Sequence, residues 1–324
     1  MRSYTAWFRD ARWGMFVHWL GRNDESAEAW NARVDAFDVD ALAEQVASTG
    51  APYLCLTVGQ NSGHFCAPNV TYDELTGIEP SKCSRRDLIV DLADALAPHG
   101  IRLLAYIPSG APAADRLACE RLEWRWGYAG DGWPHSIHEN GVPVRTGKRL
   151  APFQRRWEAV LREWGERWAS KVHGWWVDGC YFADEMYRFA DEPNFASLAA
   201  ALKAGNASRI VAFNPGVKVP VVCHTEHEDY TAGEIAEALP AHREACPADG
   251  MVGGAQYHIL TYAGQTWCQA PPRFPDPLVV GFTQHIVERG GVVTWDVPIS
   301  REGVVPDAFI AQLRKVGEAM GRSG

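Results

Sequence analysis

Short apolar runs of strand length alternate with amphipathic stretches of helical length along the whole 324-residue chain. We expect strands at eight places, over residues 12–18, 53–58, 101–107, 174–178, 209–213, 219–223, 255–261 and 292–297. We expect helices over residues 39–48, 87–96, 153–171, 195–203, 278–288 and 306–320. Strands that are mostly separated by helices are typical of a parallel sheet that closes on itself. The pattern therefore predicts an α/β fold, a (β/α)8 TIM-type barrel, in a single domain over residues 1–324.

Three connecting segments are too long to be plain loops. They cover residues 59–83, 108–151 and 224–254, are rich in Gly, Pro, His and Trp, and each follows the C-terminal end of an expected strand. In parallel barrels the C-terminal ends of the strands carry the site. We therefore expect the functional residues at the strand ends and in these segments.

Charge and composition exclude several classes of partner. The formal net charge is −9 and no run of Lys and Arg is present, which argues against nucleic acid. The chain has no apolar stretch as long as a signal peptide or a membrane span, so we expect a cytoplasmic protein with no membrane partner. The eight cysteines form no CxxC pair and fit neither a disulfide framework nor a zinc knuckle. We expect buried, reduced thiols, no metal and no cofactor.

Tryptophan is unusually frequent, with 14 residues. One group, Phe153, Trp157, Leu161, Trp164 and Trp168, recurs at helical spacing and predicts a packing stripe in the core. The tryptophans at strand ends are different, because flat aromatic faces in a site stack on sugar rings.

Asp178 is the strongest candidate for a catalytic residue. It ends the apolar run Trp175-Trp176-Val177, where a carboxylate is costly to bury without a purpose, and Gly179 leaves its approach open. The alternative is that Asp178 caps the next element or pairs with a buried arginine.

Hydrogen-bonding and aromatic residues lie at the other strand ends. Amides and imidazoles bind hydroxyl groups, aromatic rings stack on sugars, and a pair of carboxyl groups can cleave a glycosidic bond. The candidate substrate-binding residues are His18, Trp19, Gln60, Asn61, His64, Tyr106, Trp176, Asn214, Trp267 and Trp295. They predict an enzyme that cleaves a small-molecule or oligosaccharide glycoside.

Two histidine features have alternative interpretations. His18 closes an apolar strand and could equally be a buried core histidine with satisfied hydrogen bonds. His224 and His227, beside Glu226 and Glu228, invite a metal interpretation. Their spacing of three fits neither a strand nor the HExxH helix of zinc proteases, so we expect no metal there.

Five segments, in order along residues 7–321, resemble glycoside hydrolase family 29, the α-L-fucosidases. WFRDARWGMFVHW is similar to the first strand of that family, APYLCLTVGQNSGHFC to the second, and RRDLIVDLADALAPHGIRLLAYIPS to the third with its preceding helix. WWVDGCY resembles the strand that bears the family's nucleophile, and VERGGVVTWDVPISREGVVPD resembles its last strand. The resemblance implies a retaining mechanism with Asp178 as the nucleophile and His18 as a ligand to the sugar hydroxyls.

The chain departs from the family pattern in three places. Gln60 and Asn61 replace the family's His-His pair, with His64 one residue out of register, and the family's W-E-x-C motif lacks its Glu around Trp267. The proton donor must then come from elsewhere. The candidates are Glu226, Glu228 and Glu234, with Glu228 first, and the resemblance of the turn at Glu234 to a family turn gives that residue a structural alternative. The β-sandwich that usually follows the family's barrel is not in this sequence, which would expose a barrel flank and allow a homo-oligomer.

Three hypotheses for the function follow. The first is a retaining exo-glycosidase for terminal fucose or a related sugar. The second is a barrel glycosidase with a different sugar specificity, suggested by Gln60 and Asn61. The third is a sugar-binding barrel without catalysis.

Overall fold

The computed structural model describes residues 3–124, 138–139, 142–143, 149–181, 183–241, 247 and 249–321. Its strands are β1 (Trp13–Val17), β2 (Tyr53–Thr57), β3 (Arg102–Pro108), β4 (His138–Glu139), β5 (Val142–Pro143), β6 (Val172–Asp178), β7 (Ile210–Phe213), β8 (Met251–Val252), β9 (Ala255–Gln256), β10 (His258–Tyr262) and β11 (Val292–Val297). Its α-helices are α1 (Ala6–Ala11), α2 (Ala27–Asp35), α3 (Val39–Thr49), α4 (Val70–Thr76), α5 (Leu88–Leu96), α6 (Arg116–Leu122), α7 (Ala151–Trp168), α8 (Ala183–Met186), α9 (Phe195–Leu202), α10 (Asp276–Val287) and α11 (Asp307–Ala319). Two short 3-10 helices are η1 (Ser3–Thr5) and η2 (Ala97–His99).

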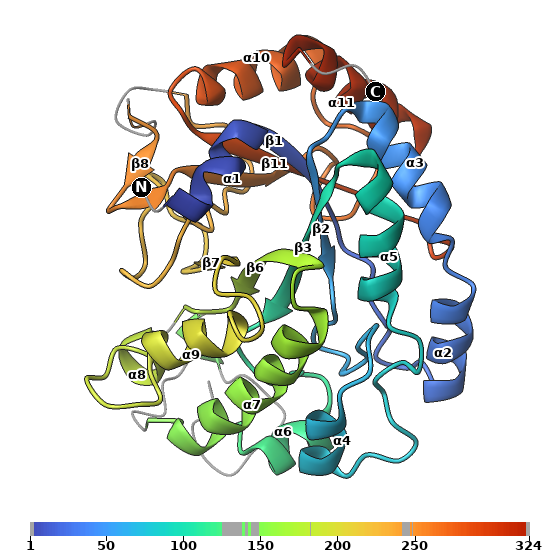
Figure 1. Ribbon diagram of the computed structural model, residues 1–324, viewed down its shortest axis with the longest axis vertical. Helices are drawn as coiled ribbons and strands as arrows, with labels where there is room; N and C mark the ends of the chain where they lie inside the picture. The colour runs from blue at the N-terminus through green and yellow to red at the C-terminus, as the bar shows by residue number, and fades with distance from the viewer. Residues whose placement is uncertain are drawn as a thin grey trace.

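Seven strands form one curled sheet of parallel strands in the order β10-β11-β1-β2-β3-β6-β7. Helices cover the outside of this sheet. The helix α3 packs against α5 and α11, and α10 packs against α11, so these four helices follow one another around one side of the molecule (Figure 1). The helix α7 packs against α9. The predicted α/β architecture is confirmed, and seven of the eight expected strands are present near their expected positions.

The expected strand over residues 219–223 is wrong. This segment is a loop in which Val219 and Val222 are 49% and 40% exposed. Pro220 has no N–H to give to a neighbouring strand, which disfavours a strand inside a sheet. The sheet therefore does not close into a regular eight-stranded ring within the described residues, and it forms a half-barrel.

An irregular segment, residues 229–235, occupies the gap between β7 and β10. We call it the seam segment. On one side it pairs with residues 256–260 through isolated parallel bridges and hydrogen bonds such as Ile235 N to Leu260 O, 3.0 Å. Toward β7 its backbone bonds only through the Asp229 N–H to the Val211 carbonyl, 2.8 Å, among the hydrogen bonds of the described residues. Gly233 has a φ of 62°, and a Cβ there would lie 1.8 Å from the His258 carbonyl, so this close approach to β10 requires glycine.

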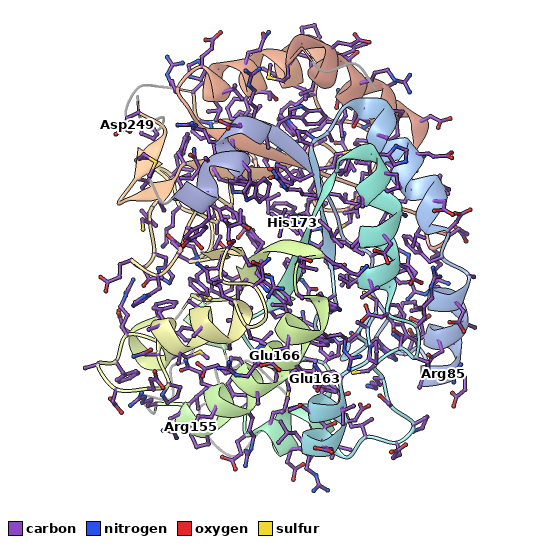
Figure 2. The ribbon with its side chains drawn as sticks, viewed as in Figure 1. Arg85, Arg155, Glu163, Glu166, His173 and Asp249 are labelled. Carbon is purple, nitrogen blue, oxygen red and sulfur yellow. The ribbon has the colours of Figure 1, made fainter. Side chains whose placement is uncertain are left out.

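Several helices lie where long connectors were expected, among them α4 in 59–83 and α6 in 108–151. Each begins at a side chain that accepts a backbone hydrogen bond, Asn69 for α4 and Asp115 for α6. Glu163 of α7 also accepts bonds from the amides of Val70 and Thr71, so α7 holds the start of α4 in place (Figure 2). The N-cap residues were visible in the sequence, but these helices are too short to show a clear apolar period.

The tryptophan stripe of α7 is confirmed as core. Trp157, Trp164 and Trp168 are at most 1% exposed. Their indole N–H groups donate to the carbonyl of Pro108, the carbonyl of Pro68 and the carboxylate of Asp87. The stripe therefore fills the core and also anchors the segments that follow β2 and β3.

Arg209 connects the strands with the helices behind them. Its guanidinium is buried and donates to five backbone carbonyls, at Gly165, Ala169, Val172, Leu202 and Ala204. No carboxylate bonds it among the hydrogen bonds and ion pairs of the described residues, and burial lowers its pKa to about 10. One side chain thus caps the carboxyl ends of α7 and α9, which have carbonyls without helical partners.

The cysteines follow the expectation in part. Cys55, Cys66, Cys83, Cys119 and Cys180 are buried free thiols, whereas Cys223 is partly exposed and Cys268 is exposed, which corrects the expectation for these two. Cys246 lies outside the described residues. No described helix combines the length and the apolar character that a membrane crossing demands.

Candidate active site

The inward-facing side chains of the parallel strands place aromatic residues under the C-terminal rim of the sheet. Tyr106 of β3 and Trp176 of β6 are register partners, and their rings stack with centroids 5.5 Å apart. Both are buried, and the Trp176 indole donates to the carbonyl of Ala232 in the seam segment. Alternate residues of a strand face the same side. The next inward-facing positions after Tyr106 and Trp176 are therefore at the strand ends, above the two stacked rings, and on β6 this position is the polar Asp178.

Asp178 ends β6 and is surrounded by donors. Its carboxylate accepts from the Tyr106 hydroxyl (2.6 Å), the Asn214 amide (2.9 Å), the Tyr181 hydroxyl (3.1 Å) and the Gly179 N–H (2.7 Å). None of these donors is an arginine, so the structure does not support the alternative of a buried ion pair. A carboxylate that accepts several hydrogen bonds in this way is fixed in direction.

Asn214 links Asp178 to Glu234. Its side-chain nitrogen donates to Asp178 Oδ1 at 2.9 Å and to Glu234 Oε2 at 2.6 Å. These two oxygens share one donor, so they can be separated by no more than about 5.5 Å, an upper limit that is compatible with a retaining carboxyl pair. Burial raises the pKa of Glu234 above its usual value, the Asn214 bond opposes this, and the charge of Asp178 raises it further. A half-buried carboxyl with a raised pKa can hold a proton for donation.

The other two glutamates do not belong to this pair. Glu228, ranked first from the sequence, is 3% exposed and accepts from the backbone amides of Phe213 and His224. Burial raises its pKa to about 8, against the hydrogen bonds, and its bonds support the loop rather than Asp178. The side chain of Glu226 is 87% exposed and lies beside His227. The structure therefore brings Glu234 together with Asp178, and it does not bring Glu226 or Glu228 into this pair.

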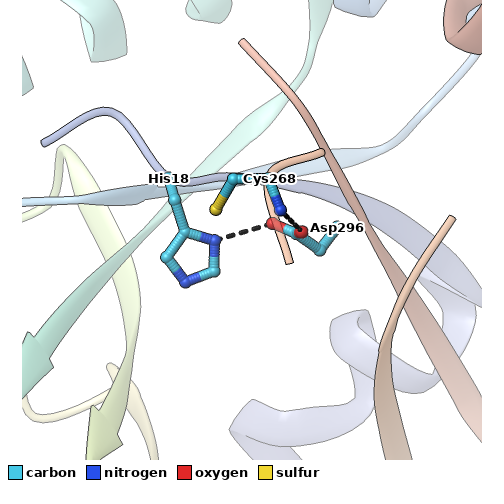
Figure 3. A group of neighbouring side chains, drawn as sticks. All are labelled: His18, Cys268 and Asp296. Carbon is cyan, nitrogen blue, oxygen red and sulfur yellow. Dashed lines mark hydrogen bonds and ion pairs between the residues drawn. The ribbon is translucent and has the colours of Figure 1, made fainter. Parts of the chain in front are cut away.

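His18, Asp296 and Cys268 form a second group at the ends of β1 and β11 (Figure 3). Asp296 is fully buried, accepts from His18 Nδ1 at 2.7 Å and from the Cys268 N–H at 3.0 Å. Burial alone lowers the pKa of His18, but the charge and hydrogen bond of Asp296 outweigh burial and raise it to about 10. His18 is thus held as a cation whose other ring nitrogen can donate to a ligand, rather than as a neutral core histidine.

The remaining predicted residues divide into two sets. Gln60 donates to the Tyr106 hydroxyl at 2.6 Å and so joins the network of Asp178. The Trp267 ring lies 6.0 Å from the His18 ring and is only partly buried. Gln60 and Trp267 therefore lie beside the residues of the site described above.

Four predicted residues lie away from the site. Trp19 is buried against Trp30 and donates to the Arg301 carbonyl, and Trp295 is fully buried and donates to Thr283 of α10. His64 is fully buried with both ring nitrogens unbonded, and Asn61 is exposed. Trp19 and Trp295 each follow or precede an inward-facing residue, so strand alternation turns them to the outer face.

The same alternation explains the place of a residue that is not among the candidates from the sequence. Asp296, next to Trp295, faces inward and orients His18. Its signal was present in the sequence, as an acidic residue within the apolar strand 292–297, which resembles the signal that identified Asp178.

His18, Cys268 and Asp296 are also the group of described residues whose ligand atoms lie close enough to hold a metal ion, all within 4.8 Å of one another. The bonds from Asp296 to His18 and to the Cys268 amide account for this arrangement without an ion. The HxxH pair makes no such group among the described residues, because His224 Nε2 bonds the Cys180 carbonyl and His227 pairs with Glu226.

Asp296→Asn is expected to remove the charge that keeps His18 protonated. The pKa of His18 should fall from about 10 to near or below 6.5, because burial then acts with little opposition. Because the pKa of His18 is higher in the folded than in the unfolded state, its ion pair stabilises the fold fully below pH 6.5. This stabilisation is lost as the pH rises through about 10. The variant should therefore lose about 3 kcal/mol near neutral pH and vary less in stability between pH 7 and 10.

NMR titration of the His18 ring and urea unfolding at several pH values would measure both effects. The matched control is Asp276→Asn, which removes a partly exposed partner of Lys315 and should cost less than about 1 kcal/mol. An unchanged His18 titration in Asp296→Asn would contradict the pairing.

Comparison with known proteins shows which of them share this fold. No protein-family model matches the chain, and no curated protein matches it in sequence. Among solved structures, the endo-fucoidan hydrolase MfFcnA4 from glycoside hydrolase family 107 aligns with a TM-score of 0.71 at 16% identity, over 97% of this chain and 53% of that one. A family 29 α-L-fucosidase from Bacteroides thetaiotaomicron aligns with a TM-score of 0.64 at 15% identity, over 99% and 74% of the two chains.

This chain shares its fold with these glycoside hydrolases. It spans 53% of MfFcnA4 and 63% of a second family 107 endo-fucoidan hydrolase, MfFcnA9, so part of each of those proteins has no counterpart in it. The resemblance to family 29 in the sequence and the likeness of the structure agree.

Proposed function

We propose that this protein is a retaining glycoside hydrolase that acts on fucose or a related sugar. Asp178 serves as the nucleophile and Glu234 as the acid and base. The observation that carries the proposal is the Asn214 side chain, whose one nitrogen holds both carboxyl groups within the spacing of a retaining pair. The matching solved structures support the sugar, because their names refer to fucosidases and fucoidan hydrolases.

The first half-reaction uses the two carboxyl groups in different protonation states. Asp178 attacks the anomeric carbon as an anion, and the bond between that carbon and the leaving oxygen breaks. Glu234 gives its proton to the leaving oxygen, which avoids the release of an alkoxide. The result is a glycosyl ester on Asp178.

The ester changes the proton affinity of Glu234. The charge of Asp178 helps to raise the pKa of Glu234, and forming the ester removes that charge. The pKa of Glu234 then falls, and its carboxylate can take a proton from the water that attacks the anomeric carbon. This water cleaves the ester, releases the sugar and restores both groups.

His18 and Gln60 bind and orient the sugar in this proposal. The His18 imidazolium, held by Asp296, donates from its free ring nitrogen to a hydroxyl. Gln60 stands where family 29 has a histidine, so we expect it to bind by amide hydrogen bonds and to alter the preference among sugars.

Hydrolysis of 4-nitrophenyl α-L-fucoside, followed by proton NMR of the first-formed sugar, tests the proposal. We expect release of 4-nitrophenol and the α-anomer as the initial product. The β-anomer as the first product would exclude retention. No cleavage of the fucoside, with cleavage of another glycoside in the same panel, would assign the site to a different sugar.

A further inference from the structure

An open hollow of about 370 Å³ lies beside the candidate active site. Its walls include Val217, Val219, Ala236, Ala238, Tyr262 and Trp267. None of the residues that hold Asp178 lines it. The hollow is therefore a separate surface that adjoins the site through Trp267, whose ring also lies 6.0 Å from that of His18.

The chain connects this hollow to the proton donor. Glu234 lies two residues before Ala236, and Asn214, which holds Glu234, lies three residues before Val217. A general acid in a glycosidase must stand beside the oxygen of the leaving group. Three wall residues, Ala236, Glu237 and Ala238, follow Glu234 closely along the chain, so the hollow lies near the general acid of the proposed function.

The walls are held in place before any ligand binds. Arg273 donates to the carbonyls of Ala236, Glu237 and Tyr262, at 3.0, 3.2 and 3.1 Å. Its guanidinium also lies 3.8 Å from the centre of the Tyr262 ring. One side chain therefore ties the segment after Glu234 to the end of β10, so the hollow does not have to form when a ligand arrives.

The side chains that line the hollow favour one kind of ligand. Val217 and Val219 are each 49% exposed, and Val222, on the same loop, is 40% exposed. Exposed large apolar side chains are normally scattered, and a group of them beside a site marks a surface for an apolar ligand. Glu237 is the charged group on the wall, and its carboxylate disfavours an anionic occupant.

We propose that this hollow is the leaving-group subsite and that it takes an uncharged, apolar aglycone, aryl or alkyl, rather than a further charged sugar. The inference rests on the proposed function, because it takes Glu234 as the proton donor. It predicts a preference among glycosides of the same sugar according to the group that leaves.

Val219→Asp and Val217→Asp test the subsite against two substrates that differ in the aglycone. The aryl substrate is 4-nitrophenyl α-L-fucoside, and α-L-fucosyl fluoride has no group that reaches the hollow. We expect KM for the aryl fucoside to rise about tenfold in each variant, because an aryl ring loses its apolar contacts, with the fluoride kinetics unchanged. Leu278→Asp, at an exposed position of α10, is the matched control and should change neither substrate.

Calorimetric binding of the non-hydrolysed phenyl and methyl 1-thio-α-L-fucosides gives a second readout that does not need turnover. The wild type should bind the phenyl compound about tenfold more tightly, and Val219→Asp should remove this preference. Equal effects of the variants on the fluoride and the aryl fucoside, or equal binding of the two thioglycosides by the wild type, would overturn the subsite alone. No cleavage of the fluoride and no binding of either thioglycoside would overturn the proposed function, and the subsite with it.

Discussion

Asp178→Gly is expected to lower kcat on 4-nitrophenyl α-L-fucoside by about 10⁴-fold or more, because the attacking group of the first half-reaction is gone. Sodium azide should restore part of the rate. The anion can enter the space left by the carboxylate. There it can accept hydrogen bonds from Tyr106 and Asn214, which the substitution deprives of their Asp178 acceptor. It attacks the anomeric carbon from the face that Asp178 occupied, the leaving oxygen takes the proton of Glu234, and the product is a glycosyl azide of inverted configuration.

Product analysis by NMR and the rate as a function of azide concentration measure this result. Asp191→Gly, at an exposed aspartate on the segment before α9, is the matched control and should neither lose activity nor respond to azide. Activity near that of the wild type in Asp178→Gly would rule out this nucleophile. A rescued product with the configuration of the substrate would rule out the proposed direction of attack.

Glu234→Gln is expected to separate substrates by the quality of their leaving group. For alkyl fucosides, which need protonation, kcat/KM should fall by about 10² to 10⁴-fold. For 4-nitrophenyl fucoside, the first half-reaction needs little help and kcat/KM should change much less. The second half-reaction loses its base with either substrate, so the glycosyl ester should accumulate and azide should speed its breakdown.

The pH profile gives the same prediction a second measurement. The first half-reaction needs protonated Glu234, whose pKa is raised by burial and by the Asp178 charge. The rate of the wild type on alkyl fucosides should therefore fall as the pH rises through that raised pKa, and this basic limb should be absent in Glu234→Gln.

Glu228→Gln is the matched control, since Glu228 is also a buried glutamate with a raised pKa, about 8. It should keep the dependence on leaving group and on pH, with a change of less than about tenfold. If Glu228→Gln instead reproduced the losses expected for Glu234→Gln, the order of the candidates inferred from the structure would be wrong.

The sequence placed residues at the strand ends correctly where the strand itself was clear. Asp178, Asn214, Tyr106 and His18 follow from one rule, that parallel strands bring their C-terminal ends to one rim. The rule needs only the position of the strand. It therefore tolerates errors of a residue or two in the boundaries.

The errors come from features that depend on exact alternation or on irregular backbone. Trp295 and Asp296 are neighbours, and which of them faces inward depends on the register of the sheet, which the sequence does not state. Glu228 and Glu234 are separated by a segment with no repeating pattern. Contacts of residues 230–235 with β10, together with the Asn214 bond, fix where Glu234 lies, and these contacts join residues that are distant in the sequence.

The seam segment has a consequence for how the two carboxyl groups are held. Asp178 stands at the end of β6, a strand with hydrogen-bonded neighbours on both sides, β3 and β7. Glu234 stands on the seam segment, which has a backbone ladder on the β10 side and mainly side-chain bonds on the other. The proposed nucleophile thus stands on a strand that is hydrogen-bonded on both sides, and the proposed acid and base on a segment with a backbone ladder on one side. This division suits a reaction in which one carboxylate must strike a single carbon, while the other must serve two different oxygens in turn, first that of the departing group and then that of water.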